Sequence, residues 1–562
     1  MSGTQRPAMM PPEPADASAS RAENSTVESA RPEPSGPQTS RPETSTPEPS
    51  TAAHATIEYS TIAAGPPREA ASRGPEGTAD PAVSAGEKML APPPSAPPSG
   101  RGRSARDGVG KGGSARDDVV EERGSRQRSA PDPGPGLRPH EHLYRAALAV
   151  VRPFARRGAG DDEKLQKGLA GRSVSVETFE AWAAEHRDPD VPLVWMHAPS
   201  AGETLMANAI LAEIRSARPD IQIAFTHFSP SAERLVDAVG ADVAAYLPWD
   251  ARRDVRRSLD ALAPSVIAYV RSEVWPVLGA EAKRRGVRVA LVNAALSPDS
   301  SRLRPGARWL LGPAYARLDL VGAVAPDDAA LYARLGAAES RTEVTGDARF
   351  DQVIARLAGD LPEDAERLRD PGTVTVVAGS TWPEDEAHLL PAFFRGGAGA
   401  RLIIAPHEPT EEHLVGIENR LNRRYLTNRR LSDIARDRQA LPEAVVVDRV
   451  GILADLYRIA DVAFVGGGFT DNGVHSVVEP AAVGIPVLLG PRHGNAREAA
   501  ALVAAGGGME VTNAAQLEGR LRTLVQYETA RGAAGRRARA FVRARTGGAA
   551  ANAAAILALV AG

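Results

Sequence analysis

The chain has no cysteine among its 562 residues. This absence excludes disulfides, thiolate catalysis and metal sites with cysteine ligands, and it fits a reducing compartment. No run of about 18 consecutive apolar residues occurs, so we expect no clear membrane-spanning helix. The chain does not open on a basic stretch followed by an apolar one, as a signal peptide does. The net charge of −3 gives no indication of a nucleic-acid partner.

Large apolar residues are also scarce in the first part of the chain. Residues 1–138 are rich in Pro, Ser, Ala, Gly, Glu and Arg, which predicts a disordered tail. We expect residues 139–172 to form a short membrane-associating helical segment. In LYRAALAVVRPFARR, residues 143–157, apolar residues share one helical face between arginines, and Pro153 kinks or ends the helix. The stretch is too short to cross a bilayer but can lie among anionic headgroups; an ordinary packing helix is the alternative.

From about residue 190 the chain alternates apolar, strand-like runs with helical stretches. The runs VPLVWMHA, IQIAFTHF and SVIAYV are typical of the first half, and TVTVVAGS, ARLIIAPH and VAFVGGG of the second. This pattern predicts an α/β fold of doubly wound parallel sheets. We expect two Rossmann-like domains facing a central cleft, at residues 173–345 and 346–562. The Ala- and Arg-rich stretch 530–560 is predicted to be helical and to reach back across the join.

The stretch VWMHAPSAGETLMANAILAEIRSA, residues 194–217, predicts a strand, a tight turn at Ser200 and Gly202, and a helix. Glu203 falls in the first helical turn, where the helix dipole favours an ionised carboxylate. A carboxylate at this edge of a sheet can act as a general base. The alternative is a capping box, in which Glu203 bonds back to a backbone N–H.

Two further motifs of the first half follow predicted strands. Ser229 stands before a helix start, where backbone N–H groups can hold an anion, although a plain helix cap is the alternative. Glu273, in the sequence RSEVWP, follows the run SVIAYV. This places Glu273 at the edge where ligands bind in such sheets, with a surface ion pair as its alternative.

In the second half, the turn Gly379-Ser380-Thr381 joins a strand to a helix that begins near Pro383. Thr381 and Glu384 fit a capping box, and a phosphate can use the same N–H groups. Glu386 lies one residue too far into the helix to be the acidic residue of a capping box, which suggests that it has another task. The triple glycine at 466–468 can form an anion nest, and no GxGxxG pattern follows it, which argues against NAD.

Polar side chains follow the triple glycine at the next strand ends. His475 and Glu479 lie in HSVVEP, where Glu479 either caps a helix with Ser476 or bonds a ribose diol. Arg492 and Asn495 follow the run IPVLLG. Polar groups at successive strand ends of both halves predict a cleft for a nucleotide sugar.

Several motifs in order carry a resemblance to a known family. HAPSAGE, YLPWD, SEVWP, LVNAALS, GDARFD, AGSTWPEDE and FVGGG…GVHSVVEPAAVGIPVLLGP…N cover about residues 140–560. The chain resembles the bacterial 3-deoxy-D-manno-octulosonic acid (Kdo) transferases of lipopolysaccharide biosynthesis. The resemblance implies a GT-B fold and inverting transfer of Kdo from CMP-Kdo to a lipid A precursor, lipid IVA. It also implies an active site without metal or cofactor, at the cytoplasmic face of the bacterial inner membrane, with peripheral or monotopic attachment.

The resemblance also assigns roles to residues. Glu203 matches the catalytic base and Glu273 a second functional carboxylate, with Ser200, Gly202 and Ser229 on the acceptor side. The positions expected to bind the donor are Gly379, Ser380, Thr381, His407, Gly467, Gly468, His475, Glu479, Arg492 and Asn495.

The chain departs from the family pattern at several of these places. Arg271 stands where the family often has an acidic residue. Pro406-His407-Glu408-Pro409 replaces a Pro-Arg-His sequence, so His407 or Arg492 is expected to make the missing arginine's contact. Two other functions stay open at this point. One is a nucleotide-sugar epimerase of the same fold, and the other is a tethered, degenerate transferase without catalysis.

Overall fold

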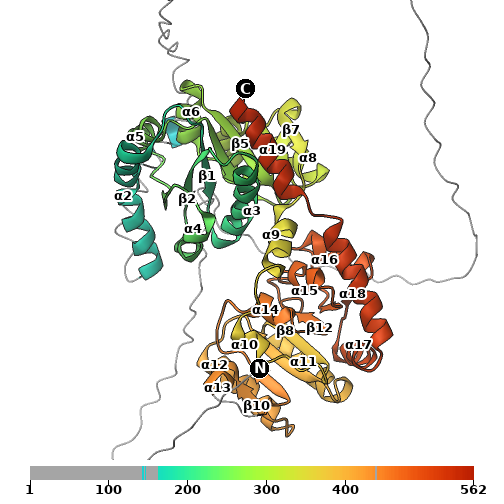
Figure 1. Ribbon diagram of the computed structural model, residues 1–562. Coiled ribbons are helices and arrows are strands. Elements are labelled where there is room, and N and C mark those ends of the chain that lie inside the picture. Colours follow the sequence, from blue (N-terminus) through green and yellow to red (C-terminus); the bar gives the residue numbers. More distant parts are fainter. Residues whose placement is uncertain (1–141, 145, 147, 149–161, 437–439, 562) are drawn as a thin grey trace, which may run out of the picture. The chain divides into compact units, whose positions relative to one another are not determined.

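The structure is a computed structural model, and it describes residues 142–144, 146, 148, 162–436 and 440–561 (Figure 1). The predicted tail, residues 1–138, lies outside the described residues, as does most of the predicted membrane-associating segment. Residues 163–172 of that segment belong to helix α2, which packs on helix α5 and strand β3. Tyr144 is helical and packs against the core of the first sheet.

The first half forms a seven-stranded sheet in the order β3-β2-β1-β4-β5-β6-β7, and all its strand pairs are parallel. Its strands are β1 Leu193–Ala198, β2 Gln222–His227, β3 Val243–Tyr246, β4 Val266–Val270, β5 Arg288–Ala294, β6 Leu320–Ala323 and β7 Thr342–Val344. The accompanying helices are α2 Glu163–His186, α3 Ala201–Ala217, α4 Glu233–Val239, α5 Arg252–Leu262, α6 Pro276–Arg284, α7 Pro305–Tyr315 and α8 Pro326–Leu335. Short 3₁₀ turns are η1 Pro230–Ala232, η2 Ser301–Leu303 and η3 Glu339–Arg341.

Both faces of this sheet are covered, which explains its continuous apolar strands. Every residue of β1 is buried. Leu193 and Trp195 point into one core, while Val194 and Met196 point into the other, as the two-residue period of a strand requires.

The second half forms another seven-stranded sheet in the order β10-β11-β9-β8-β12-β13-β14, also parallel throughout. Its strands are β8 Thr375–Thr381, β9 Arg401–Pro406, β10 Asn428–Arg430, β11 Ala444–Val446, β12 Val462–Val465, β13 Val487–Leu489 and β14 Gly508–Glu510. The helices here are α9 Ala348–Leu357, α10 Glu363–Glu366, α11 Pro383–Gly396, α12 Glu411–Asn422, α13 Leu431–Arg436, α14 Leu453–Tyr457, α15 Val478–Val483, α16 Arg497–Ala504, α17 Ala514–Gln526 and α18 Glu528–Arg543. Two doubly wound parallel sheets confirm the predicted α/β class with the two-sheet organisation of GT-B proteins.

The last helix, α19 Gly548–Ala561, confirms that the end of the chain returns to the first sheet. It packs against α3 and β5, beside which it lies in Figure 1. Asn552 fixes the position of α19 against the first sheet. Its side-chain oxygen accepts from Asn293 N and from Thr345 Oγ1, both at 3.0 Å. Ala553 and Ile556 are buried in the same core. The last helix is thereby part of the first half's hydrophobic core.

The order of the strands fixes where a ligand can bind. In each sheet the chain first adds strands on one side of its first strand. It then returns to the other side of that first strand and adds the remaining strands in the opposite direction. The two neighbouring strands at this reversal are β1 and β4 in the first sheet, and β8 and β12 in the second. At such a switch point the connections leave to opposite faces of the sheet, which opens a crevice at the carboxyl ends of the strands.

Candidate functional site

The two carboxylates that the sequence singled out follow the strands of the first switch point. β1 continues through Ser200 into α3, whose first turn carries Glu203. β4 continues through residues 271–275 into α6, and Glu273 lies in this connection. Both residues are therefore at the edge where parallel sheets bind ligands.

Glu203 has a partly exposed carboxylate with a hydroxyl partner. The Ser200 hydroxyl donates to Glu203 Oε2, and no side chain caps the first N–H groups of α3. The capping box, the alternative interpretation of this motif, is therefore not formed. Gly202 beside it is exposed, and a Cβ there would have only the Ser200 hydroxyl near it, at 3.8 Å. The carboxylate is thus accessible, near the positive end of a 17-residue helix.

Glu273 faces a buried histidine instead of a surface cation. Its Oε2 atom lies 3.7 Å from Nε2 of His197, whose side chain is fully buried. The His197 ring is held from the other side, because Nδ1 lies 3.1 Å from both Oγ1 and the carbonyl oxygen of Thr226. Tyr269 and Trp275 pack edge-on against the imidazole. The surface ion pair considered as an alternative for Glu273 is therefore not observed.

The connection that carries Glu273 is held by Asp250, a residue whose role sequence reasoning missed. Its carboxylate accepts from the N–H groups of Val277 (3.0 Å) and Leu278 (2.8 Å), at the start of α6. Burial raises the pKa of Asp250 to about 6, although these N–H groups and the Tyr144 hydroxyl oppose the rise. Asp250 closes the YLPWD motif, so this motif fixes the start of α6.

Ser229, predicted on the acceptor side, caps the short turn η1. Its Oγ accepts from Ser231 N at 3.2 Å, so the plain-cap alternative is realised. The preceding Phe228 stacks on Trp275, with ring centroids 5.8 Å apart, and the Arg172 guanidinium lies over the Phe228 ring. These contacts bring the loop after β2 beside the connection that carries Glu273.

At the second switch point the backbone at the end of β8 touches the glycine turn that follows β12. Ser380 has a left-handed backbone, with φ of 53°, which is uncommon for a residue with a side chain. A Cβ on Gly466 would lie 2.3 Å from the carbonyl oxygen of Ser380, so only glycine fits opposite this turn. A similar constraint applies to Gly379, where a Cβ would lie 2.2 Å from Tyr457 Oη. Close packing therefore accounts for these glycines.

The predicted anion nest at the triple glycine already holds an anion of the protein itself. Asp385 is fully buried, and its carboxylate accepts from Gly467 N at 2.7 Å and from Phe469 N at 3.2 Å. It also accepts from Trp382 N at 3.0 Å and so caps α11. Burial raises the pKa of Asp385, and these N–H groups limit the rise. The predicted box of Thr381 and Glu384 is not formed, because Asp385 takes that place.

Glu386 has the separate task that its position suggested. It is fully buried, and its Oε1 atom accepts from Thr381 Oγ1 at 3.0 Å and contacts His413 Nε2 at 2.8 Å. Arg420 donates to Oε2 at 3.2 Å. The hydrogen bond to Glu386 is the main reason that the pKa of His413 is raised, since it favours the imidazolium. Thr381 therefore uses its hydroxyl inside the protein, and Glu386 ties the turn after β8 to α12.

Three rings stack beside this turn. Trp382 lies on His407 with centroids 4.7 Å apart, and His407 lies on His475 at 4.4 Å. Trp382 Nε1 donates to His475 Nε2 at 3.2 Å. Because indole is a donor only, His475 accepts at Nε2 and carries its proton on Nδ1. Burial, with a smaller effect of His407, lowers the pKa of His475 to about 4.

The remaining predicted donor residues follow strands β12 and β13. Asn495 donates to the carbonyl oxygen of Val474 at 2.9 Å and packs against Gly473. Glu479 accepts from the Ser476 hydroxyl, although Val477 is the N-cap of α15. Arg492 is exposed and contacts Asp471 at 2.5 Å. Binding of a donor by these residues stays a prediction.

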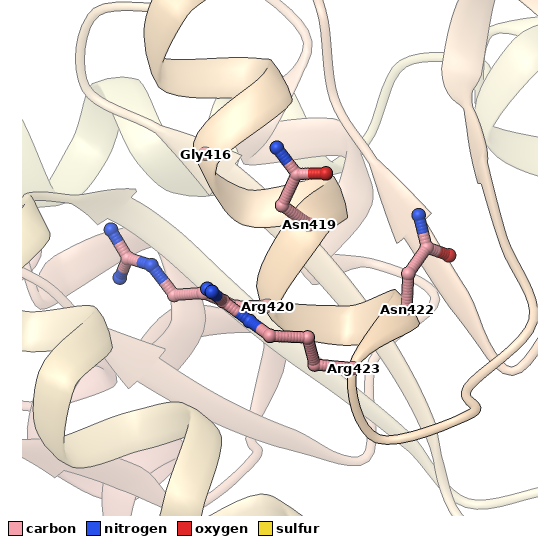
Figure 2. Close-up of a pocket in the computed structure, with 5 residues that line it drawn as sticks. All are labelled: Gly416, Asn419, Arg420, Asn422 and Arg423. Carbon is pink, nitrogen blue, oxygen red and sulfur yellow. The ribbon is translucent and has the colours of Figure 1, made fainter.

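A surface depression lies elsewhere, along α12 (Figure 2). It has a volume of about 510 Å³ and is lined by Gly416, Asn419, Arg420, Asn422 and Arg423. None of the predicted site residues lines it. In residues 162–436 and 440–561 we find no group of three acidic or histidine side chains arranged to hold a metal ion.

The chain is similar in sequence to proteins of known family. Residues 174–352 match the family model described as 3-deoxy-D-manno-octulosonic-acid transferase (kdotransferase). A 3-deoxy-D-manno-octulosonic acid transferase from Bordetella pertussis is 29% identical, over 66% of this chain and 88% of that protein. One from Haemophilus influenzae is 26% identical, over 53% of this chain and 70% of that protein.

Among solved structures, a UDP-GlcNAc 2-epimerase from Neisseria meningitidis bound to UDP-GlcNAc is 13% identical. The match covers 66% of this chain and 99% of that one, with a TM-score of 0.47. The C-terminal CMP-Kdo binding domain of WaaA from Acinetobacter baumannii is 19% identical. That match covers 35% of this chain and 98% of that domain, with a TM-score of 0.29.

The buried network of Glu386 gives a first testable prediction. Glu386→Ala removes the carboxylate that Arg420 and His413 contact. Because their positive charges are then left without a partner, the free energy of unfolding should fall by about 3–5 kcal/mol. The matched control is Glu384→Ala, two residues away on the exposed side of α11, which should change it by less than about 0.5 kcal/mol. Denaturant unfolding measures both; equal effects of the two variants would contradict the network's role.

His475 gives a prediction about pH. Its folded-state pKa, about 4, lies below the value of about 6.5 for an unfolded histidine. Its contribution to stability is therefore full above about pH 6.5 and is lost as the pH falls toward 4. His475→Gln keeps an acceptor for Trp382 and does not titrate. Between about pH 7 and pH 5 the urea midpoint of the natural chain should fall more than that of the variant. A parallel fall in both would show that His475 is not held neutral.

Proposed function

Because the chain belongs to the family of 3-deoxy-D-manno-octulosonic acid transferases, we propose that it transfers Kdo from CMP-Kdo to lipid IVA, a lipid A precursor. The observation that carries this proposal is the carboxylate of Glu203. It lies at the switch point of the first sheet, accessible, beside a serine hydroxyl, and not used as a helix cap. The epimerase and scaffold alternatives have no comparable observation in their favour.

In the proposed reaction Glu203 acts as the general base. It takes the proton from the acceptor hydroxyl as that oxygen attacks the anomeric carbon of Kdo, and the bond to the CMP phosphate breaks with inversion. The helix dipole of α3 favours the ionised carboxylate before the reaction. The Ser200 hydroxyl orients Glu203 by its hydrogen bond to Oε2.

Glu273 has a different setting, and we assign it a different role. Its Oε2 atom is buried and faces His197, which Thr226 holds in place. A carboxylate in a fixed position beside a fixed imidazole is suited to orient a substrate hydroxyl through hydrogen bonds. We therefore propose that Glu273 positions the acceptor or the sugar, and that Glu203 moves the proton.

The donor half supports binding of the CMP-Kdo nucleotide at the second switch point. The N–H groups of Gly467 and Phe469 already donate to the Asp385 carboxylate, so we propose that other groups bind the phosphate. The stack of Trp382, His407 and His475 lies at the same strand ends and presents the partly exposed His407 ring there. Nδ1–H of His475 is a second donor at this place. We propose that these two histidines serve in place of the family's arginine.

We also propose that the protein works at the cytoplasmic face of the bacterial inner membrane, peripherally or as a monotopic protein, because its acceptor is a lipid. Among the described residues, Glu528–Ala561 is long and apolar enough to be considered as a membrane span. However, α19, which forms its second part, packs Ala549, Ala553 and Ile556 into the first core. We therefore base membrane attachment on residues 143–157.

Replacing the proposed base tests the mechanism. Glu203→Gln keeps the size and the hydrogen bond from Ser200 but cannot accept a proton at neutral pH. Initial rates of Kdo transfer to lipid IVA should fall at least about a hundredfold, with the thermal midpoint unchanged. Glu213→Gln is the matched control, because Glu213 is exposed near the other end of α3. Turnover of Glu203→Gln near that of the control would reject Glu203 as the base.

A further inference from the structure

Buried polar atoms without a partner gather in the connection between β4 and α6. Among the described residues, Nη1 of Arg271, Oε2 of Glu273 and Nε1 of Trp275 are buried and make no hydrogen bond, and the same holds for Nε2 of His197. Folded proteins pair nearly all such atoms, so a group of them in a single stretch requires an explanation. A bound substrate supplies such partners.

Arg271 is the most unusual residue of this group. Its φ is 79°, a left-handed conformation that is a genuine outlier for a long side chain. The backbone is fixed there by two hydrogen bonds: Arg271 N donates to the carbonyl oxygen of Val292 at 3.0 Å, and the Tyr332 hydroxyl donates to the Arg271 carbonyl at 2.8 Å. Strain that neighbouring groups maintain in this way is typical of functional positions.

The position of Arg271 at the end of a strand is consistent with contact to a ligand. It directly follows β4, which lies between β1 and β5, and so it stands at the switch point that also carries Glu203. Only one residue separates it from Glu273. The Arg271 side chain therefore begins at the edge where the reaction is proposed to take place.

Asp347, an acid on which the charge of Arg271 acts, already has another arginine as its partner. Asp347 is buried and bonded to Arg349, whose Nε lies 2.8 Å from Oδ2 and whose backbone N–H donates to Oδ1 at 3.0 Å. Burial raises the pKa of Asp347, but Arg349 and, more weakly, Arg271 lower it overall. The charge of Arg271 thus acts on an acid that already has an arginine partner.

A second guanidinium lies on the same edge. Burial raises the pKa of the Tyr332 hydroxyl, and the positive charges of Arg271 and Arg302 both oppose that rise. Arg302 lies in η2, after β5, the neighbour of β4. Two arginines in the connections that follow the neighbouring strands β4 and β5 make this side of the switch point attractive to an anion.

We propose that Arg271, with Arg302 from the connection after the neighbouring strand β5, forms an anion site that binds a phosphate or carboxylate group of a substrate at the acceptor half of the protein. The planar guanidinium donates to such oxygens in pairs, and its buried Nη1 lacks any other partner. The identification of the ligand rests on the proposed function, in which the acceptor carries phosphates and the donor sugar a carboxylate. Arg271 is a binding residue in this account, and Glu203 remains the base.

The first experiment tests the anion site without Kdo chemistry. Calorimetric titration of the full chain with inorganic phosphate should show binding that weakens about tenfold or more in Arg271→Gln, the expected effect of losing a charge-assisted hydrogen bond. Arg308→Gln is the matched control, because Arg308 is exposed on α7 of the same half. Arg271→Gly should weaken binding equally without lowering the thermal midpoint, because glycine adopts the left-handed backbone without strain.

The second experiment distinguishes the two sources of the anion. If the acceptor supplies it, Arg271→Gln raises KM for phosphorylated lipid acceptor and leaves KM for the dephosphorylated lipid unchanged. If the donor supplies it, the variant raises KM for CMP-Kdo with either acceptor. Equal phosphate binding in Arg271→Gln and Arg308→Gln, with unchanged KM values, would overturn the anion site while transfer itself persists. Loss of phosphate binding in a chain that transfers no Kdo would instead keep the site and remove the proposed function.

Discussion

The structure depends on one constraint: all strands of each sheet are parallel, so all of them end at the same edge. Wherever the winding direction reverses, two neighbouring strands send their connections to opposite faces, and the edge between them is open to a ligand. In the first sheet these connections carry Glu203 and Glu273; in the second, Ser380 lies near the end of β8 and the triple glycine directly follows β12. Residues about 70 positions apart in the chain are thereby brought to the same two-strand edge.

What separates the proposed binding residues from the structural ones is the state of their hydrogen bonds. Asp250, Asp385 and Glu386 are buried, and each has its carboxylate oxygens bonded to backbone N–H groups or to neighbouring side chains. They fix the start of α6, the glycine turn and the turn after β8. Glu203 has one hydroxyl partner, and Glu273 has a buried oxygen without any. Carboxylates that the fold does not use are the ones available for a substrate.

The sequence predicted the strong periodic features well. The central strands β1, β2, β4, β8, β9 and β12 were visible as apolar runs, and Glu203 and Glu273 were recognisable as the first acidic residues after two of them. The edge strands β10, β14 and β7 were not predicted. They are three residues long, and β10, Asn428–Arg430, is wholly polar. Such strands form because a neighbouring strand offers them hydrogen bonds, which leaves little signal in the chain.

Long-range partners were also beyond the reach of sequence patterns. Asp250 caps a helix that starts 26 residues later, so no local spacing reveals it. The box predicted for Thr381 and Glu384 was wrong by a single residue, because Asp385 also satisfies the N–H groups of Gly467 and Phe469, more than 80 residues away. Strain at Arg271 and Ser380 is a property of the backbone that only coordinates show. The strand ends that carry the candidate residues were therefore predictable, while the hydrogen bonds among those residues were not.

We propose that this chain transfers Kdo to a lipid acceptor with Glu203 as the base. Mass analysis of lipid IVA after incubation with the purified full chain and CMP-Kdo tests it most directly. The account predicts a product heavier than the acceptor by one or more Kdo residues, formed by the natural chain and by Glu213→Gln but almost absent with Glu203→Gln. Unchanged lipid with the natural chain, or equal product with Glu203→Gln, would contradict it.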